Sequence, residues 1–386
     1  MLTQPARHPA PLLAFLAIAA GLLLAVPAAG QTTGGVKPGF SLVWRRPSPP
    51  LRALDISPQG ARVALLTTDG KIAIWDAPSA KPLWSKFGVT GANVALSDGV
   101  GYAFVYDALN PLNENVTFFD AATGRVVATK RLDGAIWGMS VSNSGDFMAV
   151  GTGEDSLYIY SLDVYPSYHR VRLRGVCNGL DFAPDGSYIA VGLWNASGVD
   201  YYDTSGKQIA SIPGNTLKRF EPFVSDDSKL VLALQYANHQ KRDPVLTLWR
   251  RDGSRVWSHG FGDNVSGVRA LTSKGGEFTI ASFYKQIVRD RVWTAERRLC
   301  LLDQTGQEAY QIGGLYLSLT LVCLSPDDSG FVAYDGDRSL YRFDRSGNAI
   351  KTWPLTAPIR AWAVTRDRRY LVLHTTDNQL MLLELR

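Results

Sequence analysis

Residues 56–76 read ISPQGARVALLTTDGKIAIWD, and variants of this stretch recur along the whole chain. Close copies begin at Phe182 (FAPDGSYIAVG) and at Leu324 (LSPDDSGFVAY). Aligned on the residue that follows the opening apolar segment, the copies start at positions 57, 97, 142, 183, 225, 272, 325 and 365. Their spacing of 40–53 residues is in the range of β-propeller blades.

Each copy predicts four short strands. The first strand ends at a turn of the Ser-Pro-Asp-Gly type, in which Pro fixes φ and Gly tolerates a positive φ. The second strand is apolar and β-branched, and the third ends in motifs such as IWD, FFD and YYD. A turn such as DAATG (120–124) follows, where Asp caps the turn and Gly takes the left-handed position. The prediction is therefore an all-β fold, a β-propeller of four-stranded antiparallel blades.

The two ends of the repeat region complement each other. The last copy, from Ile359, lacks a fourth strand, whereas Phe40–Arg46 (FSLVWRR) precedes the first copy and resembles a fourth strand. We therefore expect the N-terminal strand to close the last blade and to remove an open sheet edge. This gives eight blades; seven is the alternative if one of the weak copies, at 97 or 272, is irregular.

The N-terminus is typical of an export signal. Arg7 precedes the uncharged apolar segment 12–26, and small residues follow in 27–30. Residues 1–30 are therefore expected to be a secretory signal peptide, or alternatively an uncleaved signal anchor. The prediction continues with a linker over 31–39, a single propeller domain over 40–386, and a periplasmic or extracellular location.

The repeats resemble two propeller families. The Trp75-Asp76 ending and the FAPDGSYIAVG phrase resemble WD-repeat propellers, but the Gly-His pair of that family is missing from the repeats. The Asp-x-x-x-Gly turn followed by an aromatic residue resembles the tryptophan-docking repeat of quinoprotein-type propellers. That resemblance implies a blade-docking role for one column of residues, namely Trp44, Trp84, Trp257 and Tyr310.

Neither resemblance implies a cofactor for this chain. Quinoprotein dehydrogenases carry an adjacent-cysteine disulfide and a calcium-binding acidic set, and neither can be matched in this sequence, so no cofactor and no metal ligand is predicted. Cys177, Cys300 and Cys323 lie in apolar runs and are expected to be buried free thiols, with a Cys300–Cys323 bridge as the alternative. No catalytic residue is predicted.

The uneven loops between the second and third strands are the expected site of function. The longest, 283–298, is rich in Arg and aromatic residues, which dominate binding hot spots. The predicted binding residues are Tyr284, Arg289, Arg291, Trp293, Arg298, Tyr236, Trp137 and Trp362. The alternatives are that 283–298 only extends a β-hairpin, with its Arg residues paired to Asp290 and Glu296, and that the two last-named Trp residues are core packing.

The composition limits the class of partner. The chain has 40 basic and 35 acidic residues and a net charge of +5. This near balance gives no reason to expect binding to nucleic acid, and none is predicted. We therefore expect a non-catalytic module or scaffold that binds a protein or a cell-envelope component, and that contacts a membrane only through an uncleaved N-terminal segment. The alternative is a quinone- or metal-dependent enzyme, dehydrogenase or lactonase-like, with its site in the central channel.

Overall fold

The computed structural model describes residues 39–98, 101–163, 166–196, 198–214, 218–237, 243–289, 292–313 and 319–386. The chain divides into two units, Met1–Val36 and Lys37–Arg386. The first unit, with the predicted signal peptide or anchor, lies outside the described residues, as does the predicted linker up to residue 38. None of the helices in the described ranges is long and apolar enough to cross a membrane.

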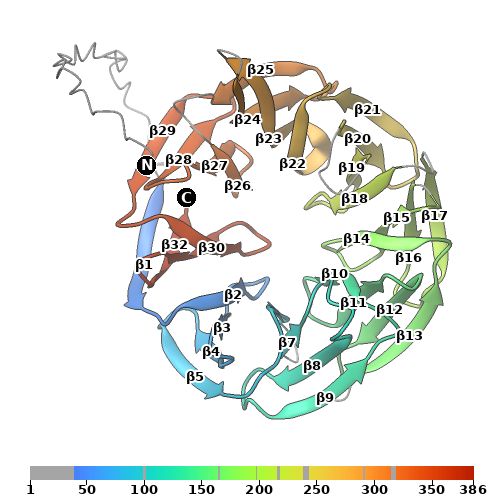
Figure 1. The fold of residues 1–386 in the computed structure, drawn as a ribbon, viewed down its shortest axis with the longest axis vertical. Helices are drawn as coiled ribbons and strands as arrows, with labels where there is room; N and C mark the ends of the chain where they lie inside the picture. The colour runs from blue at the N-terminus through green and yellow to red at the C-terminus, as the bar shows by residue number, and fades with distance from the viewer. Residues whose placement is uncertain are drawn as a thin grey trace, which may run out of the picture. The chain divides into compact units, whose positions relative to one another are not determined.

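The second unit is a ring of eight four-stranded antiparallel sheets (Figure 1). Blades 1 and 2 comprise β2 (Leu51–Ile56), β3 (Arg62–Thr67), β4 (Ile72–Asp76) and β5 (Lys81–Lys86), then β6 (Asn93–Leu96), β7 (Tyr102–Tyr106), β8 (Asn115–Asp120) and β9 (Val126–Arg131). Blades 3 and 4 comprise β10 (Ile136–Val141), β11 (Phe147–Thr152), β12 (Ser156–Ser161) and β13 (Ser167–Arg172), then β14 (Val176–Phe182), β15 (Ile189–Trp194), β16 (Gly198–Tyr202) and β17 (Gln208–Pro213).

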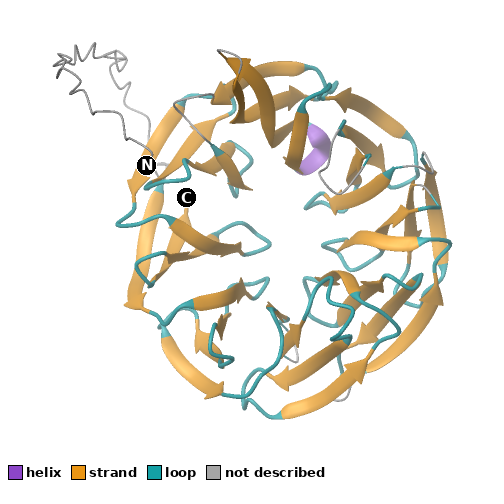
Figure 2. Ribbon diagram, in the orientation of Figure 1, coloured by secondary structure: helices purple, strands orange, loops and turns teal. Residues whose placement is uncertain are grey.

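The second half of the ring repeats the pattern. Blades 5 and 6 comprise β18 (Arg219–Val224), β19 (Leu230–Tyr236), β20 (Val245–Arg250) and β21 (Arg255–Gly260), then β22 (Val265–Thr272), β23 (Phe278–Arg289), β24 (Val292–Asp303) and β25 (Glu308–Gly313). Blades 7 and 8 comprise β26 (Thr320–Leu324), β27 (Gly330–Tyr334), β28 (Ser339–Asp344) and β29 (Ala349–Pro354), then β30 (Ile359–Val364), β31 (Tyr370–Thr375), β32 (Gln379–Leu385) and β1 (Phe40–Pro47). The single helical element in the described ranges is the short turn η1 (Lys274–Gly276), seen in Figure 2.

The N-terminal strand closes the ring, as the sequence predicted. β1 pairs antiparallel with β32 from Phe40↔Leu385 to Pro47↔Gln379, so β32 has a neighbour on both sides. The amide of Gly39 also donates to the carbonyl oxygen of Arg386 at 3.0 Å. Because β1 completes a fourth strand in blade 8 and the chain forms eight four-stranded sheets, the eight-blade prediction is confirmed and the seven-blade alternative is wrong.

The repeated Ser or Thr after the first strand has a structural purpose. The Ser97 hydroxyl accepts the Tyr102 amide at 2.9 Å, the Ser142 hydroxyl accepts the Phe147 amide at 3.1 Å, and the Thr365 hydroxyl accepts the Tyr370 amide at 2.9 Å. These bonds close the turn between the first and second strands in three different blades. A small buried hydroxyl at this position satisfies an amide that the turn would otherwise leave unpaired.

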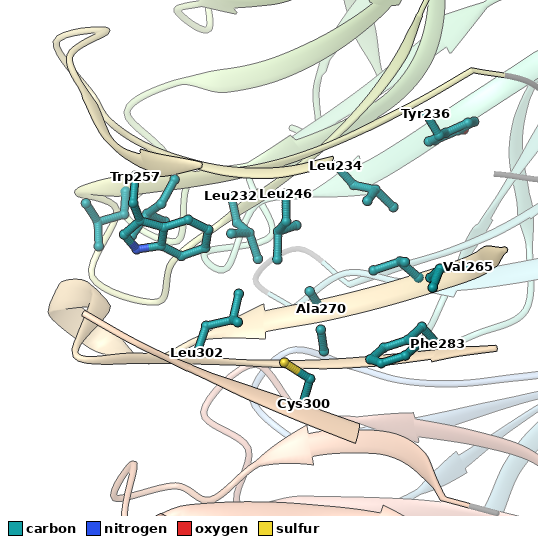
Figure 3. Packing of buried hydrophobic residues seen from close by; sticks show 14 residues of the cluster. Leu232, Leu234, Tyr236, Leu246, Trp257, Val265, Ala270, Phe283, Cys300 and Leu302 are labelled. Carbon is teal, nitrogen blue, oxygen red and sulfur yellow. The ribbon is translucent and has the colours of Figure 1, made fainter. Parts of the chain in front are cut away.

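Aromatic rings of the outer strands pack against the turn of the next blade. The indole nitrogen of Trp44 donates to the Ala77 carbonyl oxygen at 2.6 Å, and that of Trp84 donates to the Ala121 carbonyl oxygen at 2.8 Å. Trp257 and Tyr310 lie against the turn glycines of the following blades, since a Cβ built on Gly306 or Gly347 would be 2.7 Å from their rings. Figure 3 shows Trp257 at one end of the apolar layer between blades 5 and 6. Each such ring removes a large apolar area from water at a blade interface.

The three cysteines are free thiols buried in the core. The alternative of a Cys300–Cys323 disulfide is therefore wrong. Burial raises the pKa of each thiol to about 12, so all three are protonated at neutral pH.

Candidate functional site

One face of the ring collects the features that a binding site needs. In every blade the first strand ends at its turn on one face, so its start, the end of the second strand and the second-to-third connection share the opposite face. We call this opposite face the loop face. It includes the connections 68–71, 107–114, 153–155, 195–197, 237–244, 290–291, 335–338 and 376–378, of which 197, 238–242 and 290–291 lie outside the described residues. The loop face is the face on which the sequence placed the binding residues.

Trp137 belongs to a stack of rings on the loop face. Its ring lies 6.1 Å from the ring of Trp194, which ends the second strand of blade 4, and the two planes are nearly parallel. The guanidinium of Arg219, at the start of blade 5, lies 3.9 Å from the Trp194 ring centroid and 5.3 Å from that of Trp137. Burial lowers the pKa of Arg219, and the side chain is 5% exposed. Three blades therefore supply one aromatic–cationic stack whose two indoles remain half-buried.

A network of hydrogen bonds fixes the Arg219 side chain of this stack. Asn178 donates from Nδ2 to the Phe220 carbonyl oxygen at 3.1 Å and to the Tyr236 hydroxyl at 2.9 Å. The Tyr236 hydroxyl donates to Glu221 at 2.7 Å, and Arg219 donates to Asn178 Oδ1 at 3.3 Å. Tyr236 was predicted as a binding residue, but it is 4% exposed and its hydroxyl is bonded within this network. Its position supports the Arg219 side chain instead of presenting a surface to a partner.

Two exposed leucines lie on the connection that is bonded to the strand of Trp137, and they were not singled out from the sequence. Leu109 and Leu112 are 61% and 94% exposed on the connection 107–114 of blade 2. The Leu109 amide donates to the Ile136 carbonyl oxygen at 2.7 Å, which fixes the connection beside Trp137. The only sequence signal was two Leu residues around an Asn-Pro pair in a predicted loop.

The 283–298 segment is a β-hairpin and not an open loop, so the alternative drawn from the sequence holds for its backbone. β23 and β24 pair from Phe278↔Asp303 to Arg289↔Val292. The neighbouring strand β22 pairs with β23 only as far as Lys285, so the tip extends beyond the rest of the blade.

The side chains of this hairpin are placed in part. Arg298 forms the expected ion pair with Glu296, with Nη2 and Oε2 2.6 Å apart. Arg297 stacks over the ring of Tyr284 at 4.5 Å and donates to the Thr320 hydroxyl of blade 7. Arg289 and Trp293 lie on the two strands, but their side chains, and the whole of Arg291, lie outside the described residues.

Trp362 faces a different space from Trp137. It lines a cavity of about 420 Å³ in the central channel, walled by first-strand residues of blades 3 to 8. The guanidinium of Arg269, which is exposed to this space, lies 5.8 Å from the Trp362 ring centroid. The sequence-predicted residues therefore divide between the channel and the loop face.

Ion pairs cross the channel from blade 8. Arg366 donates to Asp181 Oδ1 at 3.4 Å and to the Phe182 carbonyl oxygen at 3.1 Å, both in blade 4 on the opposite side of the ring (Figure 1). Arg368 is paired with Asp226 of blade 5 and Asp328 of blade 7. These contacts tie distant blades together.

Comparison with known proteins identifies the fold and no family. No protein-family model matches the chain, and no curated protein matches its sequence. Among solved structures, hydrazine synthase of Kuenenia stuttgartiensis is similar with a TM-score of 0.53 and 13% identity, over 87% of this chain and 96% of that one.

Two further structures have the same architecture. The β-propeller domain of Myceliophteria thermophila Cps50 (Swd1) is similar with a TM-score of 0.51 and 12% identity, over 90% of this chain and all (100%) of that one. The computationally designed protein Ika8 reaches a TM-score of 0.58 and 15% identity, over 88% of this chain and 97% of that one. This chain is a β-propeller, and its assignment to the WD-repeat-like or quinoprotein-type families stays a prediction.

Proposed function

We propose that this protein is an exported, non-catalytic module that binds another protein or a cell-envelope component through its loop face. The observation that carries the proposal is the group formed by Leu109, Leu112, Trp137, Trp194 and Arg219, which we call the aromatic patch. The connection that carries the two exposed leucines is bonded to Ile136, the residue before the half-buried Trp137. Exposed apolar groups that gather on one face mark interaction sites.

The aromatic patch is organised before any partner arrives. Arg219 is fixed by Asn178 and lies against both indoles, so binding would not have to order these side chains. A preorganised surface loses less conformational entropy on association. Trp and Arg are also the residue types whose truncation costs interfaces most.

The hairpin of blade 6 supplies a second contact region in this proposal. Tyr284 is 36% exposed and Val288 is 55% exposed, and Arg297 holds the Tyr284 ring from one side. Arg289, Arg291, Trp293 and Arg298 follow on the same hairpin. A two-stranded arm on the same face as the aromatic patch would enlarge the contact area toward the size of a specific interface.

Affinity capture from the native cell envelope tests the proposal. Trp137→Ala with Leu112→Ala removes apolar surface from the aromatic patch, and Trp293→Ala with Arg291→Ala truncates two of the binding residues predicted from the sequence. Ile350→Ala is the matched control, since Ile350 is 43% exposed on the outer strand of blade 7. We expect the partner captured by the wild type to be lost with the patch variant and retained with the control. Equal recovery with a folded patch variant would show that the loop face is not the binding surface.

Export is a separate part of the proposal and rests on residues 1–30. Fractionation of the native host, followed by determination of the mature N-terminus, tests it directly. A chain that begins near residue 31 in the periplasm or medium supports a cleaved signal. An intact N-terminus in the membrane fraction would replace it with the signal anchor, and an intact chain in the cytoplasm would refute export.

The alternative function is an enzyme with its site in the channel, and the cavity of about 420 Å³ beside Arg269 is the observation that favours it. That alternative predicts a quinone chromophore or a channel-bound metal in protein purified from its native host. An absorption spectrum without a chromophore would count against it. So would a metal analysis that finds no ion bound in the channel.

A further inference from the structure

A histidine, a cysteine and a glutamate meet at the outer end of the interface between blades 5 and 6. His259 lies on β21, the outer strand of blade 5, whereas Cys300 and Glu308 lie on β24 and β25 of blade 6. One ligand atom from each of the three side chains lies within 4.8 Å of the other two. Figure 3 shows the sulfur of Cys300 in the layer between the two blades, among the same residues as Trp257 and Leu302.

We propose that His259, Cys300 and Glu308 form a binding site for a divalent cation of the zinc class, with water as the fourth ligand. An imidazole nitrogen, a thiolate and a carboxylate are the donor set that Zn²⁺ takes in proteins, and the soft sulfur selects against Ca²⁺ and Mg²⁺. The three residues come from two blades and three strands, so the set has no linear motif in the sequence.

The distances fit a tetrahedral ion after small side-chain movements. Cys300 Sγ lies 3.7 Å from Glu308 Oε2. Bonds of the usual Zn–S and Zn–O lengths place these two atoms about 3.6 Å apart in a tetrahedral site. No separation among the three ligand atoms exceeds 4.8 Å, so the set has to close by about 1 Å at most, which the rotamers of a half-buried His259 and an exposed Glu308 permit.

Neighbouring groups orient two of the ligands. His259 Nδ1 lies 3.1 Å from the Gly306 carbonyl oxygen, so a proton on Nδ1 is donated there and Nε2 keeps its lone pair. Gln311 donates from Nε2 to Glu308 Oε2 at 2.7 Å and holds the carboxylate. Metal-binding His and carboxylate side chains are oriented by bonds of this kind. The thiol proton of Cys300, which now points to Glu308, is replaced by the ion on binding, and one proton is released to solvent.

The proposal is independent of the loop face. The site joins the outer strand of blade 5 to blade 6 and shares no residue with the aromatic patch, so a bound ion would stabilise one blade interface. Because it binds the folded chain through residues of two blades, the ion raises the apparent stability with the logarithm of its concentration over Kd.

Metal titration of the full chain, freed of metal by a chelator, tests the site. We expect one Zn²⁺ per chain with release of a proton, a higher Tm, and a near-ultraviolet thiolate-to-cobalt charge-transfer band when Co²⁺ is the probe. Glu308→Gln and His259→Gln lie outside the buried core, and each should weaken Zn²⁺ binding by about 100-fold or more, whereas Gln311→Ala should weaken it by about 10-fold.

Matched controls separate this site from adventitious binding. His169→Gln changes an exposed histidine on the outer strand β13, and Cys177→Ser changes a buried free thiol of blade 4. Both should bind Zn²⁺ as the wild type does. Failure of the wild type to bind, equal affinity in the Glu308→Gln and His259→Gln variants, or a cobalt spectrum without the thiolate band would each overturn the proposal.

Discussion

The packing of an outer-strand ring on the next blade can be measured at Trp257 and Gly306. Gly306 has φ +78°, and a Cβ built there would lie 2.7 Å from the Trp257 indole. Gly253 occupies the same turn position one blade earlier, with φ +84° and nothing within 4 Å of the added Cβ. Gly306→Ala therefore adds backbone strain and a steric clash, whereas Gly253→Ala adds backbone strain alone.

The expected magnitudes follow from these two environments. Gly253→Ala should lower the free energy of unfolding by about 1–2 kcal/mol, the cost of a left-handed residue that carries a Cβ. Gly306→Ala should cost about 2–5 kcal/mol, because overpacking adds about 1–3 kcal/mol to the backbone strain. Trp257→Ala, at a side chain that is 5% exposed, should cost about 3–5 kcal/mol.

The double variant isolates the contact. In the Trp257→Ala background the clash is gone, so Gly306→Ala should cost only about 1–2 kcal/mol and the cycle should show a coupling of about 1–3 kcal/mol. Urea unfolding followed by far-ultraviolet circular dichroism measures all four free energies. An equal cost for the two glycine variants, or strict additivity in the cycle, would refute this packing of Trp257.

Four further predictions concern the channel, the ring closure and the loop face. Burial raises the pKa of Asp55 from 3.8 to about 7, so the folded chain holds a proton that the unfolded chain has lost between these values. Stability should therefore fall as the pH rises through this window, and Asp55→Asn should reduce that fall by up to about 4 kcal/mol in urea titrations at several pH values. Arg366→Ala removes the bonds to Asp181 and Phe182 and should cost about 1–2 kcal/mol by the same titration; an unchanged midpoint would contradict the bridge across the channel. A chain that begins at residue 48 lacks β1 and should expose β32 to fast hydrogen exchange and to association, whereas slow exchange in β32 would contradict closure by β1. Leu112→Ala should change the free energy of unfolding by less than about 0.5 kcal/mol yet weaken partner binding by about fivefold or more in a titration with the captured partner, and unaltered affinity would remove Leu112 from the interface.

The blades, their turns and the ring closure could be predicted because their signals are local and repeated. Asp76 illustrates this: the sequence placed it in a turn, and its carboxylate accepts the Ser79 amide at 3.0 Å. The pairing of β1 with β32 was also accessible, since one strand was missing at one end of the repeat and present at the other.

The candidate site could be predicted only in part, because its residues come from different blades. Trp137 was noticed, but its stack with Trp194 and Arg219 joins blades 3, 4 and 5, and no spacing along the chain records that meeting. Tyr236 was predicted as a binding residue because it belongs to 235–243, one of the uneven loops expected between the second and third strands. The bond from Asn178 fixes its hydroxyl inside instead.

The cluster of His259, Cys300 and Glu308 could not be predicted from the sequence for the same reason. From the sequence, Cys300 was predicted to be a buried free thiol in an apolar strand. The short distance from His259 to Cys300 and Glu308 depends on how the outer strand of blade 5 lies against blade 6.

Site-specific photo-crosslinking in the native host tests whether the loop face is the binding surface. A photoreactive residue is placed at position 112, which is 94% exposed in the aromatic patch, or at position 350, which is 43% exposed on an outer strand. If partners bind the loop face, we expect one discrete adduct of constant mass from position 112 and none from position 350. Adducts from position 350 with none from position 112 would contradict it.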